Sequence, residues 1–251
     1  MVKSDKVRID QLLVDRNLVE SRTRAQALII AGKVIVGEHR IDKPGTRVSN
    51  EAEIRIKGSD HPFVSRGGVK LDGALDVFNL DVSGMTVADV GASTGGFTDC
   101  LLQRGAQRVY ALDVGRGQLH NKLQQDPRVI SIEGINVRYL EADALPEKVD
   151  LATFDLSFIS LKLILPSLLP HLKPGGNLLA LVKPQFEVGK EQVGKGGIIR
   201  DPDLRQKAVD GIAEFVREIG LEIVGESQSQ LPGVDGNIEI FLLLSTMGVK
   251  S

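Results

Sequence analysis

Four charged side chains are candidate catalytic groups: two follow apolar, strand-like segments, one interrupts such a segment, and one lies before the first of them. Asp155 follows VDLATF, Lys183 follows NLLALV, and Glu239 interrupts the final apolar run NIEIFLLL. Lys70 lies further upstream, in SRGGVKL. Two lysines with two carboxylates could take the proton of a weakly acidic hydroxyl and stabilise the alkoxide that forms. Each residue alone also has a plainer explanation, as part of a solvated helix face, a strand-end lysine or the outer side of an edge strand.

A glycine-rich segment separates a strand-like stretch from a helix-like one. It reads DVGASTGGFT over residues 89–98 and contains Gly91, Gly95 and Gly96. Glycine lets the backbone approach a ligand closely, although a tight turn would also require it. The segment has neither the Gly-Lys-Ser/Thr of a P-loop nor the G-x-G-x-x-G spacing of dinucleotide-binding proteins. Asp113 ends the next strand-like stretch, about twenty residues on, where an acid can accept both hydroxyls of a ribose.

These residues require a scaffold that alternates strands and helices. Short apolar, β-branched stretches occur at TVADVG, RVYALDV, VISIEG, VDLATFD and NLLALVK. Helix-like patterns lie between them, in FTDCLLQRG, ISLKLILPSLLPHL and PDLRQKAVDGIAEFVREIG. This alternation predicts an α/β fold with a mostly parallel sheet covered on both faces. The last two strand-like stretches, LEIVGESQSQ and NIEIFLLLST, have no helix between them, so we expect an antiparallel pair at the sheet edge.

The first 60 residues have a different pattern, typical of a small separate domain. RIDQLLVDRNL and RTRAQALIIAG predict two short helices, the second with Ser21 as its N-cap and Gly32 at its end. Short strands separated by turns follow. Arg22 and Arg24 fall in the first turn of the second helix, where the helix dipole disfavours cations. They are either solvated or placed to hold a phosphate beside the free backbone N–H groups.

Charge divides the chain in a similar way. Residues 1–70 hold 14 Lys and Arg against 9 Asp and Glu, a net charge of +5. The remainder holds 17 basic and 24 acidic residues, a net charge of −7, so the overall charge of −2 conceals an asymmetry. A basic N-terminal part favours a polyanionic partner, although only weakly on its own.

Composition excludes several classes of protein. With 42% hydrophobic and 25% charged residues, the chain has the make-up of a globular protein, and no apolar run approaches the roughly 20 residues of a transmembrane helix. A single cysteine, Cys100, excludes an internal disulfide and a cysteine zinc site, and the four histidines lack ligand spacing, so we expect no metal. The charged start is unlike a secretory signal, so a cytoplasmic protein is expected.

The N-terminal motifs resemble those of the αL-type RNA-binding domain, which occurs in a ribosomal small-subunit protein, pseudouridine synthases and tyrosyl-tRNA synthetases. The matching patterns are RxDxL, SRTRAQxLIxAGxVxV and KPGxxV, from residue 7 to about residue 56. The resemblance implies that structured RNA is contacted from this domain. The residues expected to face RNA are Arg22, Arg24, Lys33 and Lys43, together with Arg66 at the end of the linker to the larger domain.

The glycine-rich segment, with the acid at the end of the next strand, resembles the S-adenosylmethionine loop of class I methyltransferases. The resemblance implies that the methionine part of the cofactor lies along the loop and its ribose near Asp113. Glu133 and Asn136, after the third strand, are the expected contacts on the adenine side. The loop positions expected to bind S-adenosyl-L-methionine are Gly91, Ala92, Ser93, Thr94, Gly95, Gly96 and Phe97.

Lys70, Asp155, Lys183 and Glu239 together resemble the Lys-Asp-Lys-Glu tetrad of FtsJ-like ribose 2′-O-methyltransferases. With DVGASTGGFTD, ALDVGxGQL and VKPQFE, and with the αL-type domain, the chain resembles the TlyA (hemolysin A) family of ribosomal RNA 2′-O-methyltransferases throughout. The resemblance implies methyl transfer from S-adenosyl-L-methionine to a ribose in ribosomal RNA, with cytidine as the expected nucleoside and ribosomal subunits as partners.

The same resemblance implies the architecture. We expect a class I, Rossmann-like methyltransferase domain with a seven-stranded mixed sheet at residues 67–251. A small α+β RNA-binding domain is expected at residues 1–60, and a linker at residues 61–66.

The resemblance also implies roles for the tetrad. Lys183 could take or stabilise the departing proton while Asp155 orients that lysine, and Glu239 would hold Lys70 or the ribose. Either lysine could be the base, and the reaction requires no metal.

Other functions fit the sequence less well. Methyltransferases that act on base amines place Pro-Pro after the fourth strand, which is followed by DLSF here. C5-cytosine chemistry needs a cysteine nucleophile, whereas Cys100 lies in a helix-like stretch and is better interpreted as a packing residue. A non-catalytic ribosome-assembly factor, a membrane-active hemolysin and a small-molecule methyltransferase remain as alternatives.

Overall fold

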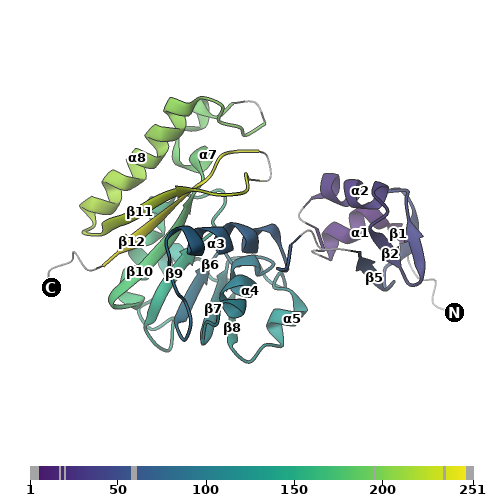
Figure 1. The fold of residues 1–251 in the computed structure, drawn as a ribbon, viewed down its shortest axis with the longest axis horizontal. Helices are drawn as coiled ribbons and strands as arrows, with labels where there is room; N and C mark the ends of the chain where they lie inside the picture. Colours follow the sequence, from purple (N-terminus) through teal and green to yellow (C-terminus); the bar gives the residue numbers. More distant parts are fainter. Residues whose placement is uncertain are drawn as a thin grey trace. The chain divides into compact units, whose positions relative to one another are not determined.

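The computed structural model divides the chain into two compact units, Met1–Ser65 and Arg66–Ser251 (Figure 1). It describes residues 6–16, 18–19, 21–57, 61–194, 196–233 and 236–246. The boundary between the units falls within the linker expected at residues 61–66. Each unit has its own hydrophobic core and is described by itself.

The N-terminal unit combines two helices with two small antiparallel sheets. Its elements are β1 (Lys6–Arg8), α1 (Ile9–Asp15), α2 (Arg22–Ile30), β2 (Val34–Val36), β3 (His39–Ile41), β4 (Arg47–Ser49) and β5 (Ile54–Ile56). β2 pairs with both β3 and β5, and β1 pairs with β4. The two helices are those that the sequence predicts. β1 and β4 were not predicted, because three residues with mixed charge give no recognisable period.

Local signals set the limits of α2. The Oγ of Ser21 accepts a hydrogen bond from the backbone N–H of Arg24 at 3.2 Å, which confirms the predicted N-cap. The helix ends at Ile30, and Gly32 has a φ of +64°, a left-handed conformation that glycine adopts with little strain. The core beneath the helices is formed by Ile9, Leu12, Leu13, Ala25, Leu28, Ile29, Val34 and Val48.

A buried carboxylate joins the two helices of this unit. Asp10, in α1, is fully buried and accepts hydrogen bonds from Arg8 at 2.9 Å, from Arg22 of α2 at 3.0 Å and from Gln26 of α2 at 3.1 Å. The hydrogen bond from Arg8 is the largest cause that holds the pKa of Asp10 well below its usual range, against the opposing effect of burial. The ionised carboxylate is therefore the form that stabilises the unit.

The second unit is built on one seven-stranded mixed sheet, with strand order β11-β12-β10-β9-β6-β7-β8. The strands are β6 (Thr86–Val90), β7 (Arg108–Asp113), β8 (Val129–Glu133), β9 (Val149–Phe154), β10 (Leu172–Val182), β11 (Glu222–Gln228) and β12 (Ile240–Ser245). Five strands run parallel, from β10 to β8, and β12 runs antiparallel between β10 and β11. The seven predicted strands and the antiparallel pair at the edge are confirmed.

Helices cover both faces of this sheet (Figure 1). The α-helices are α3 (Arg66–Val77), α4 (Gly96–Gln103), α5 (Asn121–Gln124), α6 (Leu165–Leu168), α7 (Pro184–Glu187) and α8 (Pro202–Glu218). The 3-10 helices are η1 (Val137–Tyr139), η2 (Leu161–Leu163), η3 (Leu169–His171) and η4 (Lys190–Gln192). α4 and α8 are the helices predicted after the glycine-rich segment and near the C-terminal end.

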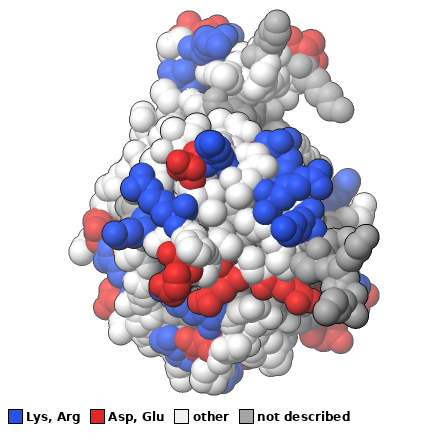
Figure 2. All heavy atoms as spheres, turned by 90° about the vertical axis from the view of Figure 1, so that its right-hand side faces the viewer, with Lys and Arg blue, Asp and Glu red and all other residues white. Residues whose placement is uncertain are grey.

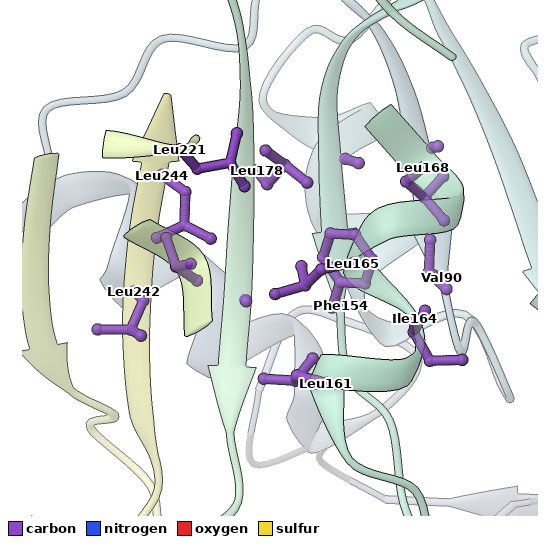
Figure 3. Packing of buried hydrophobic residues seen from close by; sticks show 14 of the residues in the cluster. Val90, Phe154, Leu161, Ile164, Leu165, Leu168, Leu178, Leu221, Leu242 and Leu244 are labelled. Carbon is purple, nitrogen blue, oxygen red and sulfur yellow. The ribbon is translucent and has the colours of Figure 1, made fainter. Parts of the chain in front are cut away.

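Each face of the sheet has its own layer of packing. On one face, Phe154, Leu178 and Leu242 of the sheet pack in a cluster with residues of η2, α6 and α8 (Figure 3). On the other face, the ring of Phe97 in α4 stacks on that of Phe241 in β12, with centroids 6.2 Å apart. Because both faces are covered, the inner strands β6, β9 and β12 are buried almost throughout.

One predicted helix is wrong in its extent. Residues 159–172 were expected to form a continuous helix, but they form η2, α6 and η3 in succession. Pro166 and Pro170 interrupt the pattern, because proline has no N–H to donate and its ring clashes with the preceding turn. The apolar spacing alone therefore overestimated the helix.

Replacing Asp10 by asparagine is expected to destabilise the N-terminal unit by roughly 1–3 kcal/mol, because the amide has one acceptor oxygen in place of two and no negative charge to offset the two guanidinium groups. Amide hydrogen exchange of α1 and α2 in the full chain measures the change. Asp15→Asn is the matched control, since Asp15 is an exposed residue of the same helix. Unchanged protection in Asp10→Asn would contradict the expectation.

Candidate active site

The register of the sheet brings three of the predicted catalytic residues to one edge. β9 and β10 run parallel, so Asp155 and Lys183, which follow them directly, leave the sheet at the same end. Val182 pairs with Ile240 of the antiparallel β12, so Glu239, just before that strand, lies beside Lys183 in the register. Ligands of α/β proteins commonly bind at this edge.

Lys183 and Asp155 form an ion pair. The Nζ of Lys183 lies 2.6 Å from Oδ1 of Asp155 and donates a hydrogen bond to the Oγ of Ser157 at 3.1 Å. The geometry of the contact is not that of a hydrogen bond, so the contact with Asp155 is electrostatic. Both side chains are mostly buried, which shields the pair from solvent and strengthens it relative to a surface ion pair.

Helix α3 supplies the fourth residue. The Nζ of Lys70 donates to Oε2 of Glu239 at 2.6 Å, and both side chains are almost fully buried. A charge buried without its partner would cost several kcal/mol, so each of these residues requires the other. The structure thus groups the four residues as two ion pairs, and their part in catalysis stays a prediction.

The glycine-rich loop closely approaches the edge of the sheet where Asp155 and Lys183 lie. Gly91 follows β6 with a φ of +85°, and a Cβ at this position would lie 2.7 Å from the backbone oxygen of Asp155. Gly95 has a φ of +92°, and a Cβ there would overlap the side chains of Leu119 and Leu123. A larger residue at Gly91 would displace either the loop or the main chain that carries Asp155.

Two carboxylates, at the ends of the adjacent strands β7 and β8, bind backbone N–H groups in and near the loop. Asp113 accepts hydrogen bonds from the backbone N–H groups of Ser93 and Gly115, both at 2.7 Å. Glu133 lies opposite Asp113 in the register of β7 and β8 and accepts from Gly117 N at 2.7 Å. Carboxylate oxygens have two lone pairs each, so both groups can still accept from the hydroxyls of a ligand.

The remaining residues predicted to bind the cofactor differ in burial and in whether their side chains are available to a ligand. The side chain of Phe97 is buried in the core, so a contact with ligand there would use the backbone. Asn136 uses its side-chain oxygen to accept from Arg138 N and so caps η1. Of the other loop residues, Ala92 is buried, Ser93 is exposed, Thr94 is half-buried and Gly96 begins α4.

A buried carboxyl group lies beneath the loop. Asp89, in β6, accepts hydrogen bonds from the hydroxyls of Thr98 at 2.6 Å and Thr153 at 3.2 Å. Burial raises the pKa of Asp89 to about 7; the Thr98 hydroxyl opposes the rise, and the negative charge of Asp155 adds to it. The sequence analysis gave Asp89 no role, although it begins the DVG motif.

An aromatic pair lies just after Asp155 and Lys183 in the sequence. Phe158, three residues after Asp155, is 90% exposed and has a φ of +66°, a conformation that is strained for a residue with a side chain. Its ring centroid lies 5.1 Å from that of Phe186, three residues after Lys183. The sequence shows both phenylalanines, in DLSF and VKPQFE, but neither the exposure nor the strain, so sequence reasoning missed them.

In the N-terminal unit, basic side chains gather around Asp10. Arg22 is half-exposed while bound to Asp10, and Arg8, which sequence reasoning missed, binds the same carboxylate. Lys43 is exposed on the loop before β4. Figure 2 shows Lys and Arg side chains in several clusters on the face that it presents, with Asp and Glu side chains beside them.

The other residues expected to face RNA are less exposed. Arg24 in α2 and Lys33 before β2 are half-buried and have contacts within the structure. Arg66 belongs to the second unit, where it begins α3 and donates to the backbone oxygen of Pro232 at 3.4 Å. An RNA-binding role for these residues stays a prediction.

Two protein families match the chain, one in each unit. The FtsJ-like methyltransferase family matches residues 63–246, and the S4 domain matches residues 7–54. Fold and site together thus define an FtsJ-like methyltransferase that carries an S4 RNA-binding domain. The 16S/23S rRNA (cytidine-2′-O)-methyltransferase TlyA of Mycobacterium tuberculosis (strain CDC 1551 / Oshkosh) is 47% identical over 242 residues, which are 96% of this chain and 90% of that protein. The chain belongs to the TlyA family.

Further relatives agree with this assignment. Hemolysin A of Brachyspira hyodysenteriae is 38% identical over 93% of this chain and 97% of its own length. The solved structure of a "putative hemolysin" from Streptococcus thermophilus superposes with a TM-score of 0.80 at 45% identity, covering 96% of this chain and 89% of that one. N-methyltransferase NodS of Bradyrhizobium japonicum, solved with S-adenosyl-L-homocysteine, shares only the fold, with a TM-score of 0.52 at 14% identity over 72% of this chain and 88% of that one.

Within the part of the chain that the structure describes, no helix is long and apolar enough to cross a membrane. Nor do three or more His, Cys, Asp or Glu side chains gather in those same residues in a way that could hold a metal ion.

The raised pKa of Asp89 gives stability a pH dependence. The protonated carboxyl suits the buried site, so its contribution is fully present below the unfolded pKa, near 4, and is lost as the pH rises through about 7. Between pH 5 and pH 8 the free energy of unfolding of the wild type is expected to fall by on the order of 2 kcal/mol relative to Asp89→Asn. Urea unfolding at several pH values measures this, and parallel curves for the two proteins would contradict it.

Proposed function

We propose that the chain transfers a methyl group from S-adenosyl-L-methionine to the 2′-hydroxyl of a cytidine ribose in ribosomal RNA. The observation that carries the proposal is the Lys183–Asp155 ion pair, held at the ends of β9 and β10 beside the loop of Gly91. The family supports the reaction, because TlyA of Mycobacterium tuberculosis is named as a 16S/23S rRNA (cytidine-2′-O)-methyltransferase. Such a reaction would take place on ribosomal subunits in the cytoplasm.

The residues at the loop fit the cofactor. The absent side chain of Gly91 leaves its backbone open to close approach, and Asp113, fixed by two backbone N–H groups, retains lone pairs for the hydroxyls of a ribose. Glu133 and Asn136 are assigned to the adenine side. When bound, S-adenosyl-L-methionine supplies an electrophilic methyl group on a sulfonium centre.

The chain's own residues would prepare the ribose. A 2′-hydroxyl is a weak nucleophile and must lose its proton as the new bond forms. As the neutral amine, Lys183 takes that proton at its Nζ, which Asp155 and Ser157 hold in place, and the ammonium that forms offsets the negative charge on the oxygen. Lys70 is held rigidly by Glu239 and adds a second positive charge. The largest contribution of the site is alignment of the oxygen with the methyl carbon.

The exposed aromatic ring supports a nucleic-acid substrate. Phe158 lies three residues from Asp155 and rests on Phe186, so one face of its ring is available to a nucleobase. Stacking of a base on an aromatic side chain contributes about 1–3 kcal/mol and works best when the base is out of the helix. Phe158 would therefore hold the base of the nucleotide whose ribose is methylated.

The N-terminal unit would supply the phosphate contacts. Arg8 and Arg22 share the Asp10 carboxylate, which fixes the direction of both guanidinium groups before RNA binds. A guanidinium held in this way can hydrogen-bond a phosphate with little further loss of entropy. Lys43 is exposed on the loop before β4. Arg24, Lys33 and Arg66 are further assigned to the RNA surface.

The structure gives little support to the alternative of a non-catalytic assembly factor. Binding alone would not need two buried ion pairs at the end of a sheet, which stabilise a fold less than apolar residues of the same volume. A small-molecule methyltransferase would not need an S4 domain.

Lys183→Ala is expected to lower the rate of methyl transfer to ribosomal RNA by about 10³-fold, because the departing proton loses its partner. Binding of S-adenosyl-L-methionine, measured by calorimetry, is expected to stay within twofold of wild type, which shows that the site is folded. Lys207→Ala, at an exposed position of α8, is the control. A variant that keeps more than a tenth of the wild-type rate would remove Lys183 from the mechanism.

An RNA substrate with 2′-deoxycytidine at the methylated position is expected to accept no methyl group, since the attacking oxygen is absent. The position is found first by mapping 2′-O-methylation in ribosomal RNA incubated with and without the protein. Transfer to the deoxy substrate at the ribo rate would show that the target is the base and not the ribose.

A further inference from the structure

One carboxylate joins the two segments that follow strands β9 and β10. Glu187, the last residue of α7, accepts a hydrogen bond from the backbone N–H of Leu161 at 2.9 Å and another from the Oγ of Ser160. Both oxygens of the carboxylate are used, one for each donor. Neither the sequence motifs nor the proposed chemistry assigns a role to this residue.

The two segments carry different halves of the site. Residues 155–160 include Asp155 and Phe158, and residues 183–187 include Lys183 and Phe186. The segments follow the adjacent parallel strands β9 and β10 but lie beyond the last residues of both strands, so the sheet does not fix their spacing. Their position relative to each other must come from side-chain contacts.

Four sets of contacts between these segments could set that spacing. The Lys183–Asp155 ion pair, the Lys183–Ser157 hydrogen bond and the Phe158–Phe186 ring contact each involve a group that the proposed function assigns to ribose or base. The two hydrogen bonds of Glu187 involve no group assigned to substrate.

The surroundings of Glu187 suit a fixed link. The Ser160 hydroxyl donates to Glu187 while its oxygen accepts from Lys162 N at 3.2 Å, so the same residue caps η2 and joins it to α7. Burial raises the pKa of Glu187, and the hydrogen bonds from Ser160 and Leu161 oppose that rise. A two-point contact with one N–H and one O–H restricts both the distance and the rotation of the joined segments.

We propose that Glu187 is a positioning residue of the methyl-transfer site, which sets the spacing of Lys183 and Asp155 by joining α7 to the turn at Ser160. The inference rests on the proposed function, because the groups that it positions are those assigned to the ribose. A misplacement of about 1 Å at a reacting group can cost on the order of 100-fold in rate. The link therefore acts on alignment and not on cofactor binding.

Ser160→Ala removes the hydrogen bond from the serine hydroxyl, Glu187→Gln replaces one of the two acceptor oxygens with an amide NH2, and Glu187→Ala removes both hydrogen bonds. We expect kcat to fall about 10-fold in the first two variants and about 100-fold in the third. The KM for RNA and the calorimetric Kd for S-adenosyl-L-methionine are expected to stay within twofold of wild type. Glu191→Gln, an exposed glutamate four residues further on, is the control.

The double variant Glu187→Gln/Ser160→Ala separates positioning from general stability. Both substitutions act on the one contact between Glu187 and Ser160, so their losses in kcat are expected to be non-additive. A purely structural role would lower kcat, cofactor affinity and the melting temperature together, and that pattern overturns the proposal. So does a kcat for Glu187→Ala within twofold of that for Glu191→Gln.

A crystal structure of Glu187→Ala makes the test independent of activity. The distance between Lys183 Nζ and Asp155 Oδ1, 2.6 Å in the wild type, is expected to exceed about 4 Å, the limit of an ion pair. An unchanged distance overturns the inference, whatever the chain methylates. If the wild type transfers no methyl to ribosomal RNA, the proposed function fails while the crystal structure still decides the role of Glu187. Should Glu187→Ala not fold, Glu187→Gln provides both readouts.

Discussion

The parallel alignment of β6, β9 and β10 is the constraint on which the site depends. Parallel strands leave a sheet at the same edge, so segments separated by dozens of residues meet there without any local attraction between them. The antiparallel β12 adds its amino end to that edge, which is how Glu239 comes to lie beside Lys183 and to receive Lys70 from α3. The loop can approach this edge only because Gly91 has no side chain between it and Asp155.

Charge at this edge is arranged in compensated pairs. Lys70 with Glu239 and Lys183 with Asp155 are each largely buried, and the isolated carboxyl group of Asp89 has a raised pKa and two hydroxyl donors. Buried ion pairs add little to stability compared with apolar residues of equal volume. Their cost is understandable if fixed charges are what the reaction requires, since a preorganised site needs no rearrangement when charge develops on the substrate.

The sequence predicts most of the scaffold and only part of the site. Strand positions in the second unit, the Ser21 cap and the end of α2 just before Gly32 follow from short-range patterns, and the interrupted helix at Pro166 could have been predicted from its prolines alone. The tetrad is identified by its resemblance to a family and not by spacing. The left-handed backbone of Phe158 and the hydrogen bonds of Glu187 depend on how distant strand ends are placed, which no periodicity records.

The sharing of one carboxylate by Arg8 and Arg22 has a consequence for how the N-terminal unit would meet a polyanion. Together with Asp10 the two arginines carry a single positive charge, and Arg55 is likewise bound to Glu38. The response of RNA affinity to salt reflects the number of counterions released, and therefore the number of phosphates that the unit neutralises, which the acidic partners keep below the number of guanidinium groups. Recognition by this unit would thus rely on the shape of directed hydrogen bonds and lose less affinity at high ionic strength than its arginine content suggests.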